Sequence, residues 1–383
     1  MDDPAFTLPT LTPIDENTQI ILLHASQHNL AALKPLLRIP GNASVQDPET
    51  GFTPLHAAIA ACEDEEGDSS EVVVGEKVDI EKAKDVVREL FISGAIWNDL
   101  DVRNETPGCL AWRLGTKTRE LYELCVEAGV RAEMLLGIMG RYEALDSGEE
   151  DDEGEEEADA DAMESEMNGH TAEGVEAEEE EKKDVNSADY LASTLKFEDD
   201  KLLDADANGV MMSWETNIMR RSVDLLLPNQ KQQAGGEGAR ILNIGFGMGI
   251  IDRMFAATKP RSHHIIEAHP AVLEKLAAAD SEFSSAWENS APPGGKYVVH
   301  KGRWQDTLPG LLESGEVFDA IYFDTFGEDY SALKEFFSEF VPGLLDENGR
   351  FGFFNGLGAD RRVCYDVYTR VAELDLSEAG WMW

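Results

Sequence analysis

From about residue 239 onward, short apolar runs alternate with longer amphipathic stretches. The apolar runs, which predict buried strands, are RILNIGF, SHHIIEAH, GGKYVVHKG, FDAIYFDTF and GRFGFFNG. Each is followed by a stretch with helical spacing, for example IIDRMFAATKP or PAVLEKLAAAD, the latter with proline at its start. Strands and helices in strict turn predict a parallel, doubly wound α/β sheet with right-handed crossovers.

The first part of the chain has helical spacing instead. TQIILLHASQHNLAALKPLLRIPG, residues 18 to 41, fits a helix pair, and residues 47 to 61 contain a turn followed by TPLHAA. TPLHAA is typical of the first helix of an ankyrin repeat, in which Thr53 caps the helix, the proline starts it and His56 bonds back to the turn. We expect two to three degenerate ankyrin-like repeats over about residues 15 to 140, with a plain helical bundle as the alternative. The histidines here are predicted to serve packing and turns.

Acidic residues dominate the segment between these two parts. Residues 149–184 hold 19 Asp or Glu side chains against two lysines, and the formal net charge of the whole chain is −44. Such a segment cannot bury enough apolar surface to fold, so we expect a disordered linker. The predicted domains are an ankyrin-like repeat domain at 1–145, an acidic linker at 146–185 and an α/β domain at 186–383. An acidic surface repels nucleic acid and anionic lipid and attracts cationic partners, although acidity that serves solubility alone explains the charge equally well.

Several classes of protein are disfavoured by the same sequence. The N-terminus, MDDPAFTLPTLTP, is acidic and has no apolar core, which argues against a signal peptide. No apolar stretch reaches the roughly 18 residues of a membrane span. Four cysteines are scattered without CxxC spacing or neighbouring histidine ligands. We expect reduced, buried thiols in an intracellular protein and no metal site.

A glycine-rich turn follows the first predicted strand of the α/β domain. ILNIGFGMGIID, residues 241 to 252, places glycine at 245, 247 and 249, whereas a dinucleotide fingerprint would need glycine where Ile250 stands. The pattern therefore favours S-adenosylmethionine over NAD, and a purely structural turn is the alternative. Glu267, at the end of the second strand, is placed to bind two ribose hydroxyls, a contact that NAD sites share.

Later strand ends supply further candidates. GRWQD follows the third strand, where Trp304 offers apolar area to an adenine and Gln305 or Asp306 can meet its exocyclic amine. The alternative is that Trp304 only caps the sheet. The fourth strand ends in Asp324, a carboxylate suited to a cationic nucleophile that loses a proton. Before the first strand, GVMMSWETNIMRRSVDLL (residues 209 to 226) is predicted as a Met-rich helix, and its spacing fits ordinary core equally well.

The order and spacing of these motifs carry a resemblance. VMMSWETNIM, ILNIGFGMGIID, IIEAH, GRWQD and FDAIYFDTFGED resemble guanidinoacetate methyltransferase and its fungal relatives, the family of protein arginine N-methyltransferase 2. The glycine turn and GRWQD are common among methyltransferases, whereas WET together with YFDT is much narrower. The fungal family (type IV) methylates the internal delta (N5) nitrogen of an arginine in a ribosomal protein and carries ankyrin-like repeats and an acidic stretch. The resemblance thus covers nearly the whole chain, and it implies a seven-stranded class I methyltransferase fold (α/β, Rossmann-like) with S-adenosylmethionine as cofactor.

The resemblance also implies the site. Glu215 and Asp324 match the two carboxylates that hold the substrate guanidinium in the smaller relative, and Asp324 is expected to take the released proton. The implied cofactor contacts are Tyr190, Met211, Met219, Phe246, Gly247, Met248, Gly249, Ile250, Ile251, Glu267, Ala268, His269, Trp304, Gln305 and Asp324. A methyltransferase for small guanidine compounds and a non-catalytic ankyrin scaffold are the alternative functions.

The expected partner is a basic protein substrate, a large-subunit ribosomal protein, docked in part by the ankyrin-like half. We expect no direct nucleic-acid or membrane binding, a monomer, and a location in cytoplasm and nucleus. The chain ends at EAGWMW, and the resemblance implies a C-terminal antiparallel hairpin beyond that point. We therefore expect this hairpin to be missing and an apolar sheet edge to be exposed. The sequence alone does not predict whether the protein is then fully active.

Overall fold

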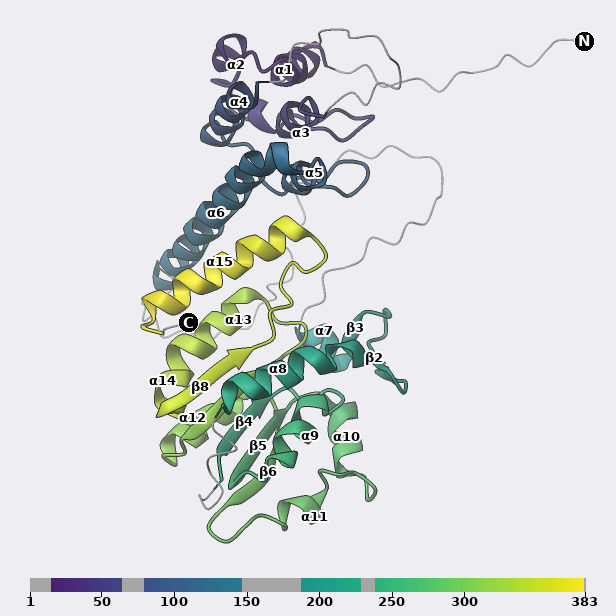
Figure 1. The fold of residues 1–383 in the computed structure, drawn as a ribbon, viewed down its shortest axis with the longest axis vertical. Helices are drawn as coiled ribbons and strands as arrows, with labels where there is room; N and C mark the ends of the chain where they lie inside the picture. The colour runs from purple at the N-terminus through teal and green to yellow at the C-terminus, as the bar shows by residue number, and fades with distance from the viewer. Residues whose placement is uncertain (1–14, 64–78, 147–186, 229–237, 382–383) are drawn as a thin grey trace, which may run out of the picture. The chain divides into compact units, whose positions relative to one another are not determined.

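The computed structural model describes residues 15–63, 79–146, 187–228 and 238–381 (Figure 1). Apart from its first residue, the acidic linker expected at 146–185 lies outside the described residues. Contacts divide the chain into two compact units. The first unit consists of residues 1–136, 315–317 and 329–383, and the second of residues 137–314 and 318–328. The predicted domains are continuous segments of the sequence, and their boundaries stay a prediction. The compact units are defined by contacts and combine segments from different parts of the chain.

The N-terminal part of the first unit is a succession of helices in mutual contact. Helix α1 contacts α2 and α3, and α3 in turn contacts α4 and α5. The helix pair predicted over residues 18 to 41 is confirmed as α1 and α2. The helices are α1 (Glu16–Ser26), α2 (Leu30–Leu36), α3 (Pro54–Ala60), α4 (Ile80–Ile92), α5 (Pro107–Arg113) and α6 (Arg119–Asp146), with short 3-10 turns at Asn42–Ser44 and Thr116–Thr118.

The local prediction for TPLHAA is confirmed atom by atom. Thr53 Oγ1 accepts a hydrogen bond from the backbone N–H of His56, and His56 Nδ1 accepts one from the backbone N–H of Thr53 at 3.2 Å. Pro54 is the first helical residue, a position at which its missing N–H costs nothing. The His56 ring is fully buried, and its Nε2 lies 3.0 Å from the carbonyl oxygen of Glu105. The same start recurs at α5, where Thr106 accepts from the N–H of Cys109.

The first unit also contains the C-terminal elements α13 (Tyr330–Glu335), α14 (Val341–Leu344), β8 (Leu345–Phe353) and α15 (Arg362–Glu378). A π-helical turn, Phe336–Phe340, joins α13 to α14, so the helical stretch after β7 is not a regular α-helix throughout. Val363 and Val367 of α15 are fully buried in the same apolar core as the N-terminal helices. A methyl group added at Gly108 or Gly129 would lie 2.6 Å from these valines, so the helices pack closely there.

The sheet confirms the predicted strands. They are β4 (Arg240–Ile244), β5 (Ser262–Glu267), β6 (Lys296–Lys301) and β7 (Phe318–Phe323), and with β8 the order is β6-β5-β4-β7-β8. The pairs β4–β5, β4–β7 and β5–β6 are parallel. Helices α9 (Ile250–Ala257), α10 (Pro270–Ala277) and α12 (Trp304–Glu313) follow β4, β5 and β6, as predicted, and the short α11 (Ser285–Glu288) was not foreseen. Five strands with alternating helices fit a Rossmann-like fold.

The helix predicted over residues 209 to 226 is wrong at its beginning. Gly209–Met212 forms a strand, β3, which pairs antiparallel with β2 (Lys201–Leu203) and is followed by a 3-10 turn, Ser213–Glu215. The true helix is α8 (Thr216–Leu226). The strand satisfies its backbone groups across β2, and Met211 within it is buried. The small sheet is completed by β1 (Lys196–Phe197), and it follows α7 (Ser187–Ala192).

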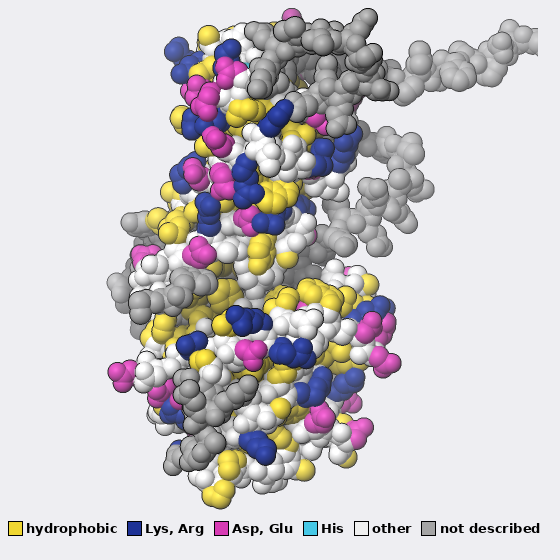
Figure 2. Space-filling view, in the orientation of Figure 1, with side chains coloured by type: hydrophobic (Ala, Val, Ile, Leu, Met, Phe, Trp, Pro, Cys, Tyr) yellow, Lys and Arg dark blue, Asp and Glu magenta, His cyan; other side chains and the backbone are white. Residues whose placement is uncertain are grey.

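Membrane spans and metal sites are two features of the described residues that bear on function. None of the helices described is both long and apolar enough for a membrane span. No group of three or more His, Cys, Asp or Glu side chains within the described ranges is placed to hold a metal ion. Cys62, Cys125 and Cys364 are buried, and Cys109 is partly buried. On the face drawn in Figure 2, basic and acidic side chains are interspersed over the described surface.

Candidate functional site

The glycine turn after β4 brings two strand ends into close contact. Gly245, Gly247 and Gly249 all have positive φ, at 90°, 54° and 69°, in the region that disfavours side chains. A Cβ atom on Gly245 would lie 1.9 Å from the carbonyl oxygen of Asp324, at the end of β7. The turn therefore needs glycine for two reasons, the backbone conformation and the approach of the neighbouring strand.

Glu267, at the end of β5, holds the turn from the other side. Its carboxylate accepts hydrogen bonds from the backbone N–H groups of Phe246 at 2.9 Å and of Gly247 at 3.3 Å, and from that of His269 at 2.7 Å. Burial raises the pKa of Glu267, while these backbone donors act in the opposite direction by favouring the charged form. The predicted acid is thus fixed beside the turn, within the cavity described next.

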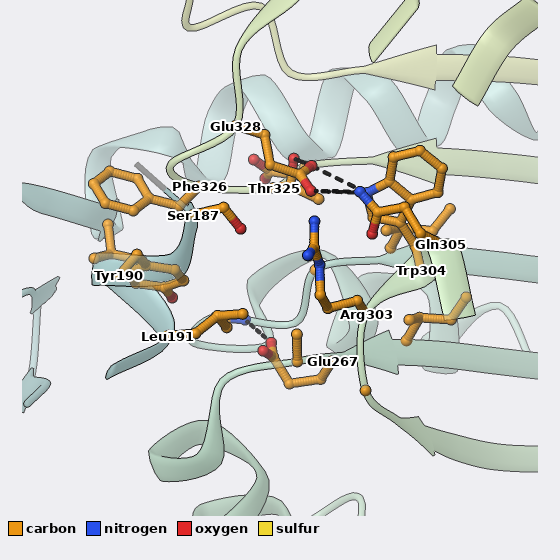
Figure 3. Close-up of a pocket in the computed structure, with 18 of the residues that line it drawn as sticks. Ser187, Tyr190, Leu191, Glu267, Arg303, Trp304, Gln305, Thr325, Phe326 and Glu328 are labelled. Atoms are coloured by element: carbon orange, nitrogen blue, oxygen red, sulfur yellow. Dashed lines mark hydrogen bonds between the residues drawn. The ribbon is translucent and has the colours of Figure 1, made fainter. Parts of the chain in front are cut away.

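A cavity of about 620 Å³, counted with its open mouth, lies at the carboxyl ends of the parallel strands. In Figure 3 the labelled side chains converge on it from α7, from the end of β5, from the start of α12 and from the segment after β7. Its location is the one at which open α/β sheets bind ligands.

The structure brings about half of the predicted contact residues to this cavity. Those that line it are Tyr190, Met211, Gly247, Glu267, Ala268, Trp304, Gln305 and Asp324. The others are not among the lining residues, namely Glu215, Met219, Phe246, Met248, Gly249, Ile250, Ile251 and His269.

Some of these other residues hold the lining residues in place. The backbone N–H of Met248 lies 3.2 Å from the Sδ atom of Met211. His269 Nε2 lies 3.0 Å from the carbonyl oxygen of Tyr190, and the two rings are in contact with centroids 4.8 Å apart. Met219 is fully buried in α8. Several predicted contacts therefore reach the cavity through a neighbour.

A buried polar network under the turn was missed by sequence reasoning. Asn243 Nδ2 donates to the carbonyl oxygen of Gly245 and to Asp252 Oδ2, both at 2.8 Å. Asp252 Oδ1 lies 3.0 Å from His263 Nε2, and all three side chains are fully buried. The network joins β4, α9 and β5. Its signal in the sequence was the presence of Asn243 and His263 inside apolar strands.

Glu328, beyond the end of β7, was also missed. Its carboxylate accepts from Trp304 Nε1 at 3.0 Å, from Gln305 Nε2 at 3.1 Å and from Thr325 Oγ1 at 2.7 Å (Figure 3). Of the two residues predicted for the adenine amine, Gln305 lines the cavity and Asp306 does not. Thr325 lies only three residues before Glu328, but Trp304 and Gln305 are 24 and 23 residues away, so no short motif contains the whole set.

Arg303 is a further unforeseen residue. It precedes Trp304, and it is the only Lys or Arg among the residues that line the cavity. Figure 3 shows its side chain extending across the cavity between Glu267 and Glu328. The lining is otherwise acidic at its charged positions, with Glu267, Asp324 and Glu328.

The carboxyl group of Asp324 is held in an environment that disfavours its ionisation. Its Oδ2 is shielded from solvent and has no hydrogen-bond partner among the described residues. Burial, together with the negative charges of Glu215 and Asp252, raises its pKa to about 7. Glu215 is itself buried and accepts from the backbone N–H of Met212 at 3.2 Å, and burial raises its pKa too. A bound cation would relieve the repulsion between these acids.

Comparisons with known proteins agree with this geometry. Residues 178–356 match the model of the guanidinoacetate N-methyltransferase family. Three curated relatives are each named protein arginine N-methyltransferase 2. The relative from Gibberella zeae is 54% identical over 95% of this chain and 83% of its own length, and that from Neurospora crassa is 55% identical over 94% and 85%. The relative from Saccharomyces cerevisiae is 39% identical over 79% of this chain and 70% of its own length. The glycine turn, the acidic strand ends and the cavity thus belong to an arginine methyltransferase, and the chain belongs to the protein arginine N-methyltransferase 2 family.

Proposed function

We propose that the protein transfers a methyl group from S-adenosylmethionine to the delta (N5) nitrogen of an arginine in a ribosomal protein. The observation that carries the proposal is the Asp324 carboxyl group. It lines the cavity beside the glycine turn, its Oδ2 has no partner among the described residues, and burial together with neighbouring negative charges disfavours its ionisation. Such a group is prepared for a positively charged ligand that can also release a proton.

The residues present fit the methyl donor. Glu267 would hold the ribose hydroxyls, and Trp304 and Gln305 would hold the adenine. The absence of a side chain at Gly247 leaves the turn open toward the cavity, which Met211 also lines. When bound, S-adenosylmethionine supplies an electrophilic methyl group on a sulfonium.

The acids of the site fit the acceptor. A guanidinium is planar, delocalised and protonated, with a pKa above about 12, so it is a poor nucleophile. Asp324 and Glu215 would pair with it, localise its charge and orient one nitrogen. As that nitrogen forms its new bond its own pKa falls, and Asp324 would receive the proton. A paired cation would also lower the pKa of Asp324, which keeps the base ionised when substrate is bound.

The remaining features support a protein substrate. The net charge of −44 favours a basic partner such as a ribosomal protein. The helices of the first unit, with TPLHAA and the second Thr-Pro start at α5, are consistent with ankyrin-like repeats that dock such a partner. A ribosomal substrate would place the protein in the cytoplasm and nucleus.

A direct test incubates the full chain with methyl-labelled S-adenosylmethionine and ribosomal proteins, then analyses the methylated arginines after hydrolysis. We expect label in delta-methylarginine of one basic protein. Label only in omega-methylated arginine would refute the assigned nitrogen, and label only in a small guanidine compound would favour the second candidate, to which the family match over 178–356 points. No label anywhere would favour a non-catalytic scaffold.

The role of Asp324 is tested by Asp324→Asn. We expect turnover to fall by about 100-fold or more, the usual contribution of a general base, while donor binding measured by calorimetry changes little. Asp329→Asn removes the same charge from an exposed helix cap nearby and should keep wild-type turnover. Turnover near the wild-type value in Asp324→Asn would rule out the proposed role.

A further inference from the structure

Of the two polar atoms in the Gln305 amide group, one has a hydrogen-bond partner among the described residues and the other has none. Its Nε2 donates to Glu328 Oε1 at 3.1 Å. Its Oε1 is buried and has no hydrogen-bond partner among the described residues. A buried polar atom without a partner is costly and rare, so such an atom on a residue that lines the cavity calls for an explanation.

Glu328 determines which end of the amide is which. Carboxylate oxygens accept hydrogen bonds and do not donate them, so the amide must turn its NH2 group toward Glu328. Reversing the amide would place two acceptors against each other. Glu328 is itself held by Trp304 Nε1 and Thr325 Oγ1, which contact the same carboxylate. The orientation of the Gln305 amide therefore follows from the acceptor character of the Glu328 carboxylate.

We propose that Glu328 is a positioning residue that determines which base the cavity accepts. By fixing the Gln305 amide, it leaves a lone acceptor, Gln305 Oε1, for the base of the methyl donor. An acceptor selects the exocyclic amine of adenine, which donates, and rejects the carbonyl of hypoxanthine, which only accepts. This inference rests on the proposed use of S-adenosylmethionine and adds the basis of its selectivity.

Binding of two product-type ligands, S-adenosylhomocysteine and S-inosylhomocysteine, to the full chain tests the inference by calorimetry. The wild-type protein should bind the adenosyl compound about 10- to 100-fold more tightly, the range expected for one unsatisfied buried polar group. Glu328→Gln offers Gln305 either a donor or an acceptor, so the amide can turn and the preference should fall to within about threefold. Gln305→Ala removes the amide and should lose the preference as well.

The ratio of the two affinities separates positioning from a general structural role. A loss of packing would weaken both ligands alike and leave the ratio unchanged. Asp329→Asn, the neighbouring acid outside the cavity, is the matched control and should keep the wild-type ratio. Circular dichroism melting checks that each variant is folded. The affinity ratio of the wild-type protein does not depend on the folding of any variant.

Each outcome bears on the inference. Equal wild-type affinity for the two ligands overturns it while leaving the proposed donor in place. A wild-type ratio retained in folded Glu328→Gln also overturns it. Failure of the wild-type protein to bind either ligand overturns the proposed donor and this inference together. A preference present in the wild type and lost in Glu328→Gln but kept in Asp329→Asn supports it.

Discussion

At this site, the properties of a single residue depend on its burial, on nearby charges and on its hydrogen-bond partners. Asp324 would be an ordinary acid in water, but here burial and the charges of Glu215 and Asp252 raise its pKa to about 7. The folded protein therefore binds the proton of the Asp324 carboxyl group more tightly than the unfolded chain does, because the pKa of this group in the unfolded chain is 3.8. By linkage, the contribution of this group to stability is full below pH 3.8 and is lost as the pH rises toward 7. Charge repulsion among these acids is a cost in stability that a bound cation would remove.

The pH dependence of catalysis should report the same group. Because Asp324 accepts a proton only when ionised, we expect kcat/KM to rise with pH and to level off above an inflection near 7. Glu215→Gln removes one of the charges that raise this pKa, so the inflection should move to lower pH, alongside weaker guanidinium binding. Asp329→Asn should leave the inflection where it is. A pH profile that is flat from 5 to 9 would contradict the assignment.

Elements of this fold were predictable to the extent that their pattern is local. The alternation of apolar runs with helical spacing placed β4, β5, β6 and β7 correctly, because burial of a parallel strand leaves a continuous apolar run. The segment Gly209–Met212 shows the limit. Its Met-rich spacing suits a helix, yet pairing with β2, which no local pattern reveals, makes it a strand.

The glycine turn is an element whose sequence and tertiary requirements can be separated by mutation. Gly245→Ala combines a φ of 90° with a Cβ 1.9 Å from the carbonyl oxygen of Asp324, so the strand ends must move apart. We expect the free energy of unfolding to fall by about 1–3 kcal/mol and donor affinity to fall with it. Gly310→Ala, inside α12 and without a neighbour within 4 Å, should instead be stabilising by about 0.5–1 kcal/mol. Chemical denaturation and calorimetry check both, and a stable, donor-binding Gly245→Ala protein would count against the close approach.

At the scale of the molecule, the C-terminal helix folds with the N-terminal ones. Val363 and Val367 of α15 are fully buried in a core that they share with residues of α5 and α6, among them Leu110 and Cys125. Tyr122 of α6 also donates to Asp366 of α15. The sequence pattern predicts a helical half, an acidic linker and an α/β half. The contacts instead place the N-terminal helices and α15 in one unit.

This arrangement makes a prediction about fragments. Residues 186–383 expressed alone would leave the apolar face of α15 without the helices that cover it. We expect this fragment to aggregate or to lack a cooperative thermal transition, whereas the full chain is folded and melts cooperatively. Size-exclusion chromatography and circular dichroism compare the two, and a monomeric, cooperatively melting fragment would disprove the shared core.

The sequence by itself determined the strands and helices of the α/β part, the helix starts at TPLHAA, the glycine turn, and the acids Glu267 and Asp324. All of these depend on neighbours within one or two turns of chain or on the ends of parallel strands, which local patterns record. The tertiary structure alone decided the hydrogen bonds of Glu328, the Asn243–Asp252–His263 network, the position of Gln305 in the cavity lining and the union of α15 with the N-terminal helices. These depend on contacts between residues far apart in the chain, and no spacing in a single sequence records which distant side chains will meet.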